Sequence, residues 1–188
     1  MKFARLLIWI IAAALLPTAS VTAEDPPTNT KTTEAADTAR APVAKPEKVV
    51  WYSYAEGVAK AKKEKKPIVI DFTASWCGWC KRMDRDTFSD REVIDYLAEN
   101  LVPIKVWGDA NTPTSHEGEA MTERDLAKLY GVRGYPMFWF LDSDAGRIGI
   151  IQGYKKPHEF LPLIKYVGGS HYKTMSYESF LKKDEGQG

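Results

Sequence analysis

The sequence predicts an α/β domain in which helices cover both faces of a mixed central β-sheet, with a helical extension at the C-terminus. The run Ile68-Val69-Ile70-Asp71-Phe72 is continuously apolar apart from one acid, which is typical of a buried central strand. Segments that begin with helix-capping patterns lie between this run and other strand-like runs. Residues 136–153 have the pattern of an antiparallel hairpin, so the sheet should be mixed.

The N-terminus is predicted to be a signal peptide at residues 1–23, cleaved near Ala23. Lys2 and Arg5 precede an apolar run at residues 6–16, and small residues follow it, in the order of a leader and its cleavage site. The run is too short to span a bilayer as a helix, although an uncleaved anchor remains the alternative. We therefore expect an exported, periplasmic protein, in a compartment where disulfides persist.

Composition divides the rest of the chain into three parts. Residues 24–48 are rich in Pro, Thr, Ala and charge, which indicates a flexible linker. Residues 49–169 fit one domain, and residues 170–188 form a C-terminal extension. Removal of Lys2 and Arg5 with the leader leaves 24 of the 26 basic residues beside 25 acidic ones. This balance argues against nucleic acid as a partner.

Helix starts in the first half of the domain are marked by capping boxes, in which Ser is followed three residues later by Glu. Pro67 ends any preceding helix, and apolar runs rich in β-branched residues mark the strands. These signals predict a strand at 49–51, a helix from Ser53-x-x-Glu56 to about Glu64, a strand at 68–72, a helix through about Asp86 that breaks near 87–89, a helix from Ser89-x-x-Glu92, and a strand at 101–107.

The second half begins with a long loop, at residues 108–121, whose length makes it a candidate for a functional role. Pro162 lies inside a predicted helix, where it removes a backbone hydrogen bond and can kink the rod. The predicted elements are a helix from Thr122-x-x-Asp125 to Gly131, hairpin strands at 136–142 and 147–153, a helix from Pro157 to about Tyr166, and a short helix at 177–183.

The motif Trp76-Cys77-Gly78-Trp79-Cys80 holds the only two cysteines of the chain. A C-x-x-C pair at the start of a helix places the second thiol about one turn above the first, close enough for a disulfide. The helix N-terminus favours the thiolate of the first cysteine. We therefore predict a redox-active disulfide in which Cys77 attacks and Cys80 resolves.

Other uses of the two cysteines are less consistent with the sequence. A tetrahedral zinc site needs two more ligands, and His116, His158 and His171 lack the usual spacing, so we expect no metal and no cofactor. A purely structural disulfide across so few residues would constrain little unfolded-state entropy. A Cys–His protease would leave Cys80 without a role. His116 and His171 are expected to face solvent.

Three further residues are candidates for the same site. Asp71 lies on the buried strand six residues before Cys77, where desolvation should raise its pKa and suit it to accept the proton of Cys80. The alternative is a structural acid in an ion pair, with Lys105 as its partner. Trp76 has an apolar face that can shield the thiolate, or it fills the core at the strand end. Trp79 should be exposed, as a substrate contact or a guard on Cys80.

From about residue 51 to residue 167 the chain resembles the thioredoxin superfamily. The segment from Ile70 to Lys81 is similar to that family's strand and active-site motif, with Trp79 in place of the usual proline. Tyr130-Gly131-Val132-Arg133-Gly134-Tyr135-Pro136 is similar to the segment before its cis-proline. Residues 55–66 and 87–90 are more similar to an exported subgroup that includes the periplasmic C-terminal domain of the transmembrane disulfide reductants.

This resemblance implies a three-layer thioredoxin-like fold and an exported thiol–disulfide oxidoreductase that favours reduction or interchange. It implies a cis Tyr135-Pro136 bond beside Cys77 for pairing with an extended substrate, and it places Lys105 next to the buried acid. The implied partners are protein disulfides and a membrane-bound thiol electron donor. A binding module or chaperone without turnover and a dithiol oxidase remain alternatives, whereas a peroxidase lacks a Thr/Pro-x-x-Cys motif.

Overall fold

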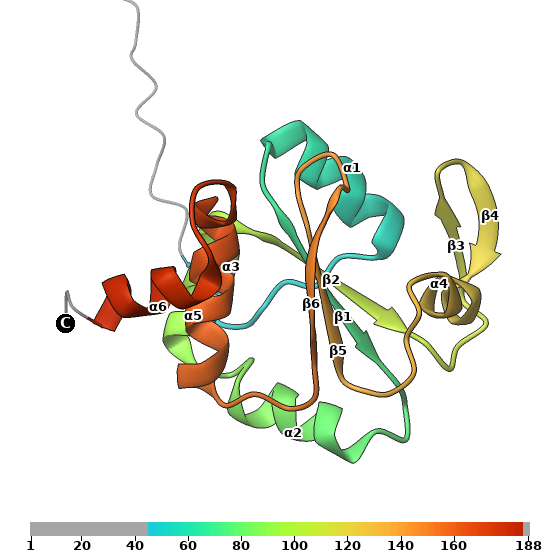
Figure 1. The fold of residues 1–188 in the computed structure, drawn as a ribbon. Coiled ribbons are helices and arrows are strands. Elements are labelled where there is room, and N and C mark those ends of the chain that lie inside the picture. Colours follow the sequence, from blue (N-terminus) through green and yellow to red (C-terminus); the bar gives the residue numbers. More distant parts are fainter. Residues whose placement is uncertain (1–44, 186–188) are drawn as a thin grey trace, which may run out of the picture. The chain divides into compact units, whose positions relative to one another are not determined.

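The computed structural model describes residues 45–185, so the predicted signal peptide and most of the predicted linker lie outside the described residues. Figure 1 shows the fold. The elements follow in this order: α1 (Tyr54–Glu64), β1 (Ile68–Thr73), α2 (Gly78–Asp86), α3 (Arg91–Asn100), β2 (Val102–Trp107), β3 (Pro113–His116), β4 (Glu119–Thr122), α4 (Glu123–Leu129), β5 (Met137–Leu141), β6 (Arg147–Gln152), α5 (Pro157–Gly168), the 3₁₀ helix η1 (His171–Lys173) and α6 (Tyr177–Glu185).

The central sheet has four strands in the order β2-β1-β5-β6. Strand β1 pairs in parallel with β2, where Asp71 lies opposite Lys105, and antiparallel with β5 on its other side. Strands β5 and β6 form the predicted hairpin, so the sheet is mixed, as expected. Every residue of β1 is buried, because both edges and both faces of this strand are covered. The continuous apolar run therefore identified the centre of the sheet correctly.

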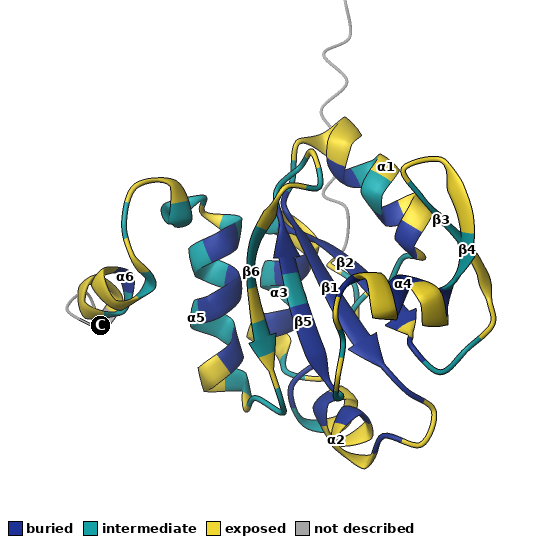
Figure 2. Ribbon diagram, turned by 45° about the vertical axis from the view of Figure 1, so that its right-hand side comes forward, coloured by how far each residue is buried: buried dark blue, intermediate teal, exposed yellow. Residues whose placement is uncertain are grey.

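Helices cover both faces of this sheet, which gives the predicted three layers (Figure 2). Ile70 and Phe72 of β1 face a core that also contains residues of α1 and α4. Val69 faces the opposite core, built with α3, α5 and Met83 of α2. Since strand residues alternate between faces, Asp71 points to the side that α2 and α3 cover. No helix among residues 45–185 is long and apolar enough to cross a membrane.

The predicted strand at residues 49–51 is wrong. Only Tyr52 pairs with the sheet, through an isolated bridge to Ile104. Its N–H donates to the Pro103 carbonyl at 3.0 Å before α1 begins two residues later. Val49 and Trp51 are apolar because they pack on the core that α3 and α5 line, and the chain turns into a helix too soon to extend the ladder.

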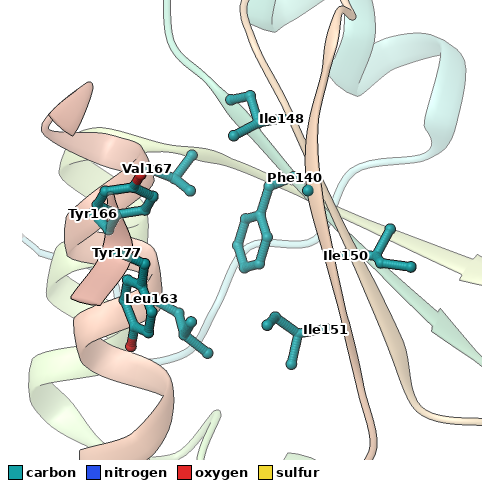
Figure 3. Close-up of a pocket in the computed structure, with 9 residues that line it drawn as sticks. Phe140, Ile148, Ile150, Ile151, Leu163, Tyr166, Val167 and Tyr177 are labelled. Carbon is teal, nitrogen blue, oxygen red and sulfur yellow. The ribbon is translucent and has the colours of Figure 1, made fainter. Parts of the chain in front are cut away.

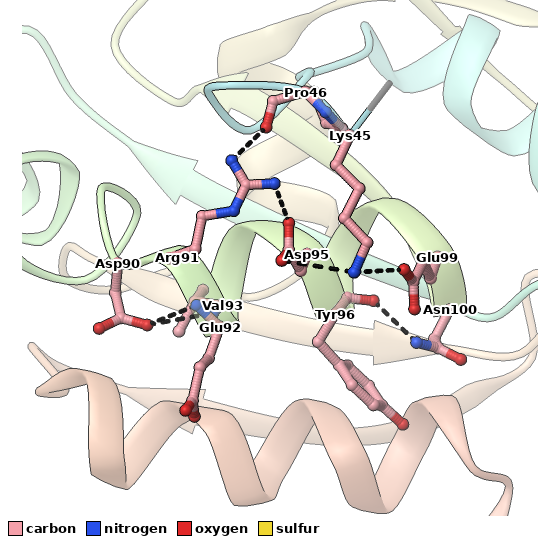
Figure 4. A network of polar contacts seen from close by, with 10 residues as sticks. All are labelled: Lys45, Pro46, Asp90, Arg91, Glu92, Val93, Asp95, Tyr96, Glu99 and Asn100. Atoms are coloured by element: carbon pink, nitrogen blue, oxygen red, sulfur yellow. Dashed lines mark hydrogen bonds and ion pairs between the residues drawn. The ribbon is translucent and has the colours of Figure 1, made fainter. Parts of the chain in front are cut away.

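Neither predicted Ser capping box forms, although Ser53 is the N-cap of α1 and both helices form where expected. The Ser53 hydroxyl donates to the Glu56 carboxylate at 2.7 Å and makes no hydrogen bond to the backbone of α1. Helix α3 is capped one residue later than predicted, by the Asp90 carboxylate, which accepts from the N–H groups of Glu92 and Val93 (Figure 4). Asx and Ser side chains compete for such positions, and the carboxylate accepts more strongly at a helix N-terminus.

Figure 4 also shows how the chain before α1 is held against α3. The Lys45 ammonium lies 3.4 Å from Asp95 and 2.9 Å from Glu99. Arg91 donates to the Pro46 carbonyl at 3.1 Å and also pairs with Asp95. These contacts are exposed, so each adds little to stability.

The predicted long loop at residues 108–121 contains a β-hairpin, which follows a shorter loop at 108–112. Strands β3 and β4 pair antiparallel across a turn at Glu117 and Gly118, whose φ angles are 52° and 87°. Glycine adopts this left-handed backbone without steric cost. The hairpin escaped sequence analysis because its short strands are mostly polar and lack an apolar period. Thr122 caps the following helix α4, as predicted, by accepting from the Asp125 N–H.

The C-terminal part follows the prediction and resolves the conflict at Pro162. Helix α5 starts with Pro157 and runs through Pro162 to Gly168. Phe160 and Ile164 on its inner face are fully buried, and this packing offsets the hydrogen bond that the inner proline removes. Helix α6 follows, and the Tyr166 hydroxyl of α5 donates to the Met175 carbonyl at 2.7 Å, which ties the extension to the domain.

Candidate active site

Cys77 and Cys80 form a disulfide at the start of α2, where the central strand β1 has just ended. Their Cα atoms are 5.3 Å apart. The Cys77 N–H donates to the Ala74 carbonyl at 3.0 Å, a tight turn that brings the chain from the strand into the helix. Cys77 is the N-cap residue, and its sulfur accepts from the Cys80 N–H at 3.1 Å. The first sulfur therefore lies among the free N–H groups of a helix terminus, where a thiolate is stabilised.

Asp109 anchors this turn from outside. Its carboxylate accepts from the Ser75 N–H at 3.0 Å and from the Ser75 hydroxyl, and these bonds hold its pKa below the usual range. Arg124 of α4 donates to the Asp109 carbonyl at 2.6 Å. Sequence analysis missed Asp109. Its place two residues after the end of β2 was the signal, because the carboxyl ends of neighbouring parallel strands meet at one edge of a sheet.

Asp71 is buried in β1, with 2% of its surface exposed. The Lys105 ammonium lies 3.3 Å from Asp71 Oδ2, whereas Oδ1 has no hydrogen-bond partner among the described residues. Burial raises the pKa of Asp71 to about 6, and Lys105 only partly opposes this rise. Asp71 is thus both ion-paired and easier to protonate than an ordinary aspartate, which combines the two interpretations that its sequence position suggested.

Lys105 contacts a second acid, Asp84, which sequence analysis did not single out. The Lys105 ammonium donates to Asp84 Oδ1 at 2.6 Å. It also lies over the rings of Trp51, 4.5 Å from the ring centre, and Phe88, at 5.6 Å. Asp84 lies one helical turn after Cys80 on α2, so an i, i+4 relation to the resolving cysteine was its signal.

Two tryptophans flank the disulfide and are exposed. Trp79 has 56% of its surface exposed, as predicted, and its ring lies 5.7 Å from that of Tyr154. The Arg82 guanidinium stacks on both of these rings, 5.5 Å and 5.3 Å from their centres. Trp76 is 69% exposed, so the structure rules out a core role for it. Both rings offer apolar surface beside the sulfurs.

Tyr135 completes the surroundings of the disulfide. It packs on the buried cluster of Ala74, Cys77 and Cys80, and its ring meets that of Trp76 edge to face at 5.7 Å. The Tyr135-Pro136 bond is cis, as expected. A Cβ atom at Gly108 would lie 2.2 Å from the Tyr135 hydroxyl, so glycine lets this ring approach the end of β2.

The histidines lie away from this site, and one prediction for them is wrong. His116 is half-buried instead of solvent-facing: its Nδ1 lies 2.7 Å from the Tyr54 hydroxyl, which also contacts the Tyr130 hydroxyl at 2.8 Å. The ring of His171 packs on that of Phe180 at 4.8 Å. Within residues 45–185, no three His, Cys, Asp or Glu residues are grouped so that they could hold a metal ion.

An apolar hollow of about 150 Å³ lies between the β5–β6 hairpin and helices α5 and α6 (Figure 3). Phe140 points into it from the sheet, and Leu163 and Tyr177 face it from the helical side. Its lining is almost entirely apolar and carries no charged side chain. The disulfide is not part of its wall.

Comparison with known proteins assigns the family. Residues 54–168 match the family model of the thioredoxin-like domain, and the chain belongs to this family. It is 29% identical over 102 residues to "Disulfide bond reductase DsbH" of Chlamydia pneumoniae, a match that covers 52% of this chain and 59% of that protein. It is 33% identical over 103 residues to "Thiol:disulfide interchange protein DsbD" of Campylobacter jejuni, covering 53% of this chain and 17% of that one.

A solved structure supports the same fold. A thioredoxin from Thermus thermophilus superposes with a TM-score of 0.54 at 29% identity, covering 66% of this chain and 92% of the thioredoxin. The match to the two relatives spans only part of their length, about three fifths of DsbH and about one sixth of DsbD. The resemblance inferred from the cysteine and proline motifs is therefore confirmed for the domain.

Proposed function

We propose that this protein is an exported thiol–disulfide oxidoreductase that reduces or exchanges disulfides in other proteins. The observation that carries the proposal is the disulfide between Cys77 and Cys80 at the N-terminus of α2, within the residues that match the family model. Both matched relatives are named for disulfide reduction or interchange. The buried Asp71 supplies a carboxyl group with a raised pKa on the strand that leads to these cysteines.

The reaction runs in two exchanges. The Cys77 thiolate attacks one sulfur of a client disulfide, which forms a Cys77–client disulfide and releases the other client sulfur as a thiolate that takes up a proton. Cys80 then gives its proton to Asp71, and its thiolate attacks Cys77 Sγ. The Cys77–Cys80 disulfide forms, and the second client sulfur leaves as a thiolate, which takes up a proton as Asp71 releases its own. The client has then gained two electrons and two protons. A thiol donor at the membrane would reduce the protein again by the same exchanges.

The client is proposed to bind over the exposed rings beside the sulfurs. Trp76 and Trp79 are largely exposed, so their rings offer a docked client apolar surface next to the sulfurs. Tyr135 packs on the same sulfurs, and its backbone, next to the cis bond to Pro136, can pair with an extended client segment. Export rests on the leader pattern at residues 1–23, and N-terminal sequencing of the secreted form should find Glu24 as its first residue.

Reduction of insulin by dithiothreitol tests the activity. The full-length protein should accelerate the appearance of free insulin thiols, whereas Cys77→Ser should not exceed the uncatalysed rate. Cys77→Ser replaces the sulfur atom by oxygen and introduces no charge, so the fold should remain intact. Equal acceleration by both proteins would exclude the proposed chemistry. If neither protein accelerated the reaction but both kept unfolded clients soluble, the binding-module alternative would hold instead.

A further inference from the structure

We propose that Asp84 is a positioning residue for the resolving step, which shares the Lys105 ammonium with Asp71, weakens the Lys105–Asp71 ion pair and so keeps Asp71 able to take the proton of Cys80. The inference rests on the proposed function and deepens it, because it names a group that tunes the proton affinity of the base. Asp84 itself touches neither sulfur in the structure. It acts through Lys105.

The contacts of Lys105 are unequal. Its ammonium donates a hydrogen bond to Asp84 Oδ1 at 2.6 Å but lies 3.3 Å from Asp71 Oδ2. The shorter contact has the length of a strong charge-assisted hydrogen bond, so the Lys105 ammonium interacts more strongly with Asp84 than with Asp71. Asp71 keeps one oxygen, Oδ1, without a hydrogen-bond partner among the described residues.

The surroundings keep the lysine in this place. Only 13% of the Lys105 side chain is exposed, and the rings of Trp51 and Phe88 lie on its ammonium. Asp84 is reached from the solvent side, with 46% of its side chain exposed. The lysine therefore bridges a surface carboxylate and a buried one, and a change at the surface can alter the buried group without opening the core.

Charge decides the direction of the effect. The charged groups that face Asp71 are Lys105 from β2 and Asp84 from α2, while the neighbour on β5 is Phe138. Lys105 favours the ionised form of Asp71, and the negative charge of Asp84 opposes it. Removal of the Asp84 charge would leave Lys105 to Asp71 alone, so the pKa of Asp71 should fall.

The direct test is a ¹³C NMR titration of the Asp71 carboxyl group in the oxidised full-length protein. In Asp84→Asn the pKa of Asp71 should fall by about one pH unit. Asp84→Glu keeps the charge and should restore the wild-type pKa. Asp86→Asn is the matched control, since it removes the same charge from the same helix at a residue that pairs with Arg82 and Arg85. An Asp71 pKa that is the same in Asp84→Asn and wild type would overturn the proposal.

A second readout is the rate at which Cys80 resolves a preformed mixed disulfide, followed against pH. In Asp84→Asn the acidic limb of this profile should move to lower pH, and the rate at neutral pH should fall about threefold to tenfold, because a weaker base accepts the proton. An acidic limb at the same pH in Asp84→Asn as in wild type would contradict the proposal. Failure of the proposed function gives a different result, since wild type would then show no resolution while the titration still reported the effect of Asp84.

Discussion

Cys77 and Cys80 occupy different positions on helix α2, but their solvent exposure is nearly the same. Both residues are buried, with 4% and 3% of their surface exposed. Cys77 is the N-cap of α2, and Cys80 lies in its first turn. The electrostatics of the helix terminus, rather than access, should therefore separate their reactivity.

Alkylation of the reduced protein tests this difference. Cys77 should react first with iodoacetamide at neutral pH, because N–H groups at the helix start stabilise its thiolate, and its apparent pKa should lie below that of a free thiol. Peptide mapping after a short reaction identifies the modified residue. Modification of Cys80 ahead of Cys77 would reverse the assigned roles.

Replacement of Asp71 by Asn tests the proton acceptor. The amide is nearly the same size, so packing should survive, but resolution by Cys80 should slow by about 10²–10⁴-fold at neutral pH. Stopped-flow measurement of mixed-disulfide resolution gives the rate. A rate equal to that of wild type would reduce Asp71 to a structural acid.

The same variant should change how stability depends on pH. The folded pKa of Asp71 is about 6 against an ordinary value of 3.8, so the folded protein holds this proton more tightly than the unfolded chain. The resulting stabilisation is present below about pH 4 and is lost as the pH rises through about 6. Asn does not ionise, so Asp71→Asn should not lose this stabilisation as the pH rises. In this variant Lys105 still has Asp84 as its ion-pair partner.

At neutral pH, Asp71→Asn should therefore be more stable than wild type, by up to about 3 kcal/mol. The gain should shrink to near zero at about pH 4. Urea melts of both proteins at the two pH values measure it. A variant that unfolds more easily at neutral pH would mean that the ion pair with Lys105 outweighs the cost of the buried charge.

At the scale of elements, local patterns predicted what local forces determine. The apolar run of β1, the break between α2 and α3, and the proline that starts α5 all appeared where expected. The β3–β4 hairpin was missed because its strands are held by their turn and by α1 and α4, and carry no apolar period of their own. Ser53 is the N-cap of α1, but its hydroxyl bonds to Glu56 instead of the helix backbone. The N-cap of α3 was misplaced by one residue, because the Ser89 hydroxyl bonds to the Arg85 carbonyl.

One close approach between elements can be tested directly. Gly108 at the end of β2 lies under the ring of Tyr135, and Gly108→Ala would place a Cβ atom 2.2 Å from its hydroxyl. We expect the ring to be displaced from the disulfide, at a cost of about 1–3 kcal/mol in the free energy of unfolding, with slower insulin reduction. Gly149→Ala in β6 is the control, because its Cβ would meet no atom within 4 Å. Equal effects of the two changes would show that Tyr135 is not held by this contact.

At the scale of the whole molecule, the fold was predictable because one central strand and one cysteine motif define it. The rest of the site was not, because its contacts join residues distant in sequence. Asp109 reaches Ser75 across 34 residues, and Lys105 reaches Asp84 across 21. Burial of Asp71 could be inferred from its apolar neighbours, but the sharing of Lys105 between two acids depends on how α2 packs against the sheet.

The central claim, that Cys77 attacks client disulfides and Cys80 resolves the product, is tested most directly by trapping. Cys80→Ser and Cys77→Ser variants of the full-length protein are mixed in reduced form with a disulfide-containing client, and covalent complexes are measured on non-reducing gels. Cys80→Ser should accumulate a mixed disulfide that dithiothreitol releases, because the resolving thiol is gone. Cys77→Ser should accumulate far less. Equal trapping by the two variants, or trapping by Cys77→Ser alone, would contradict the account.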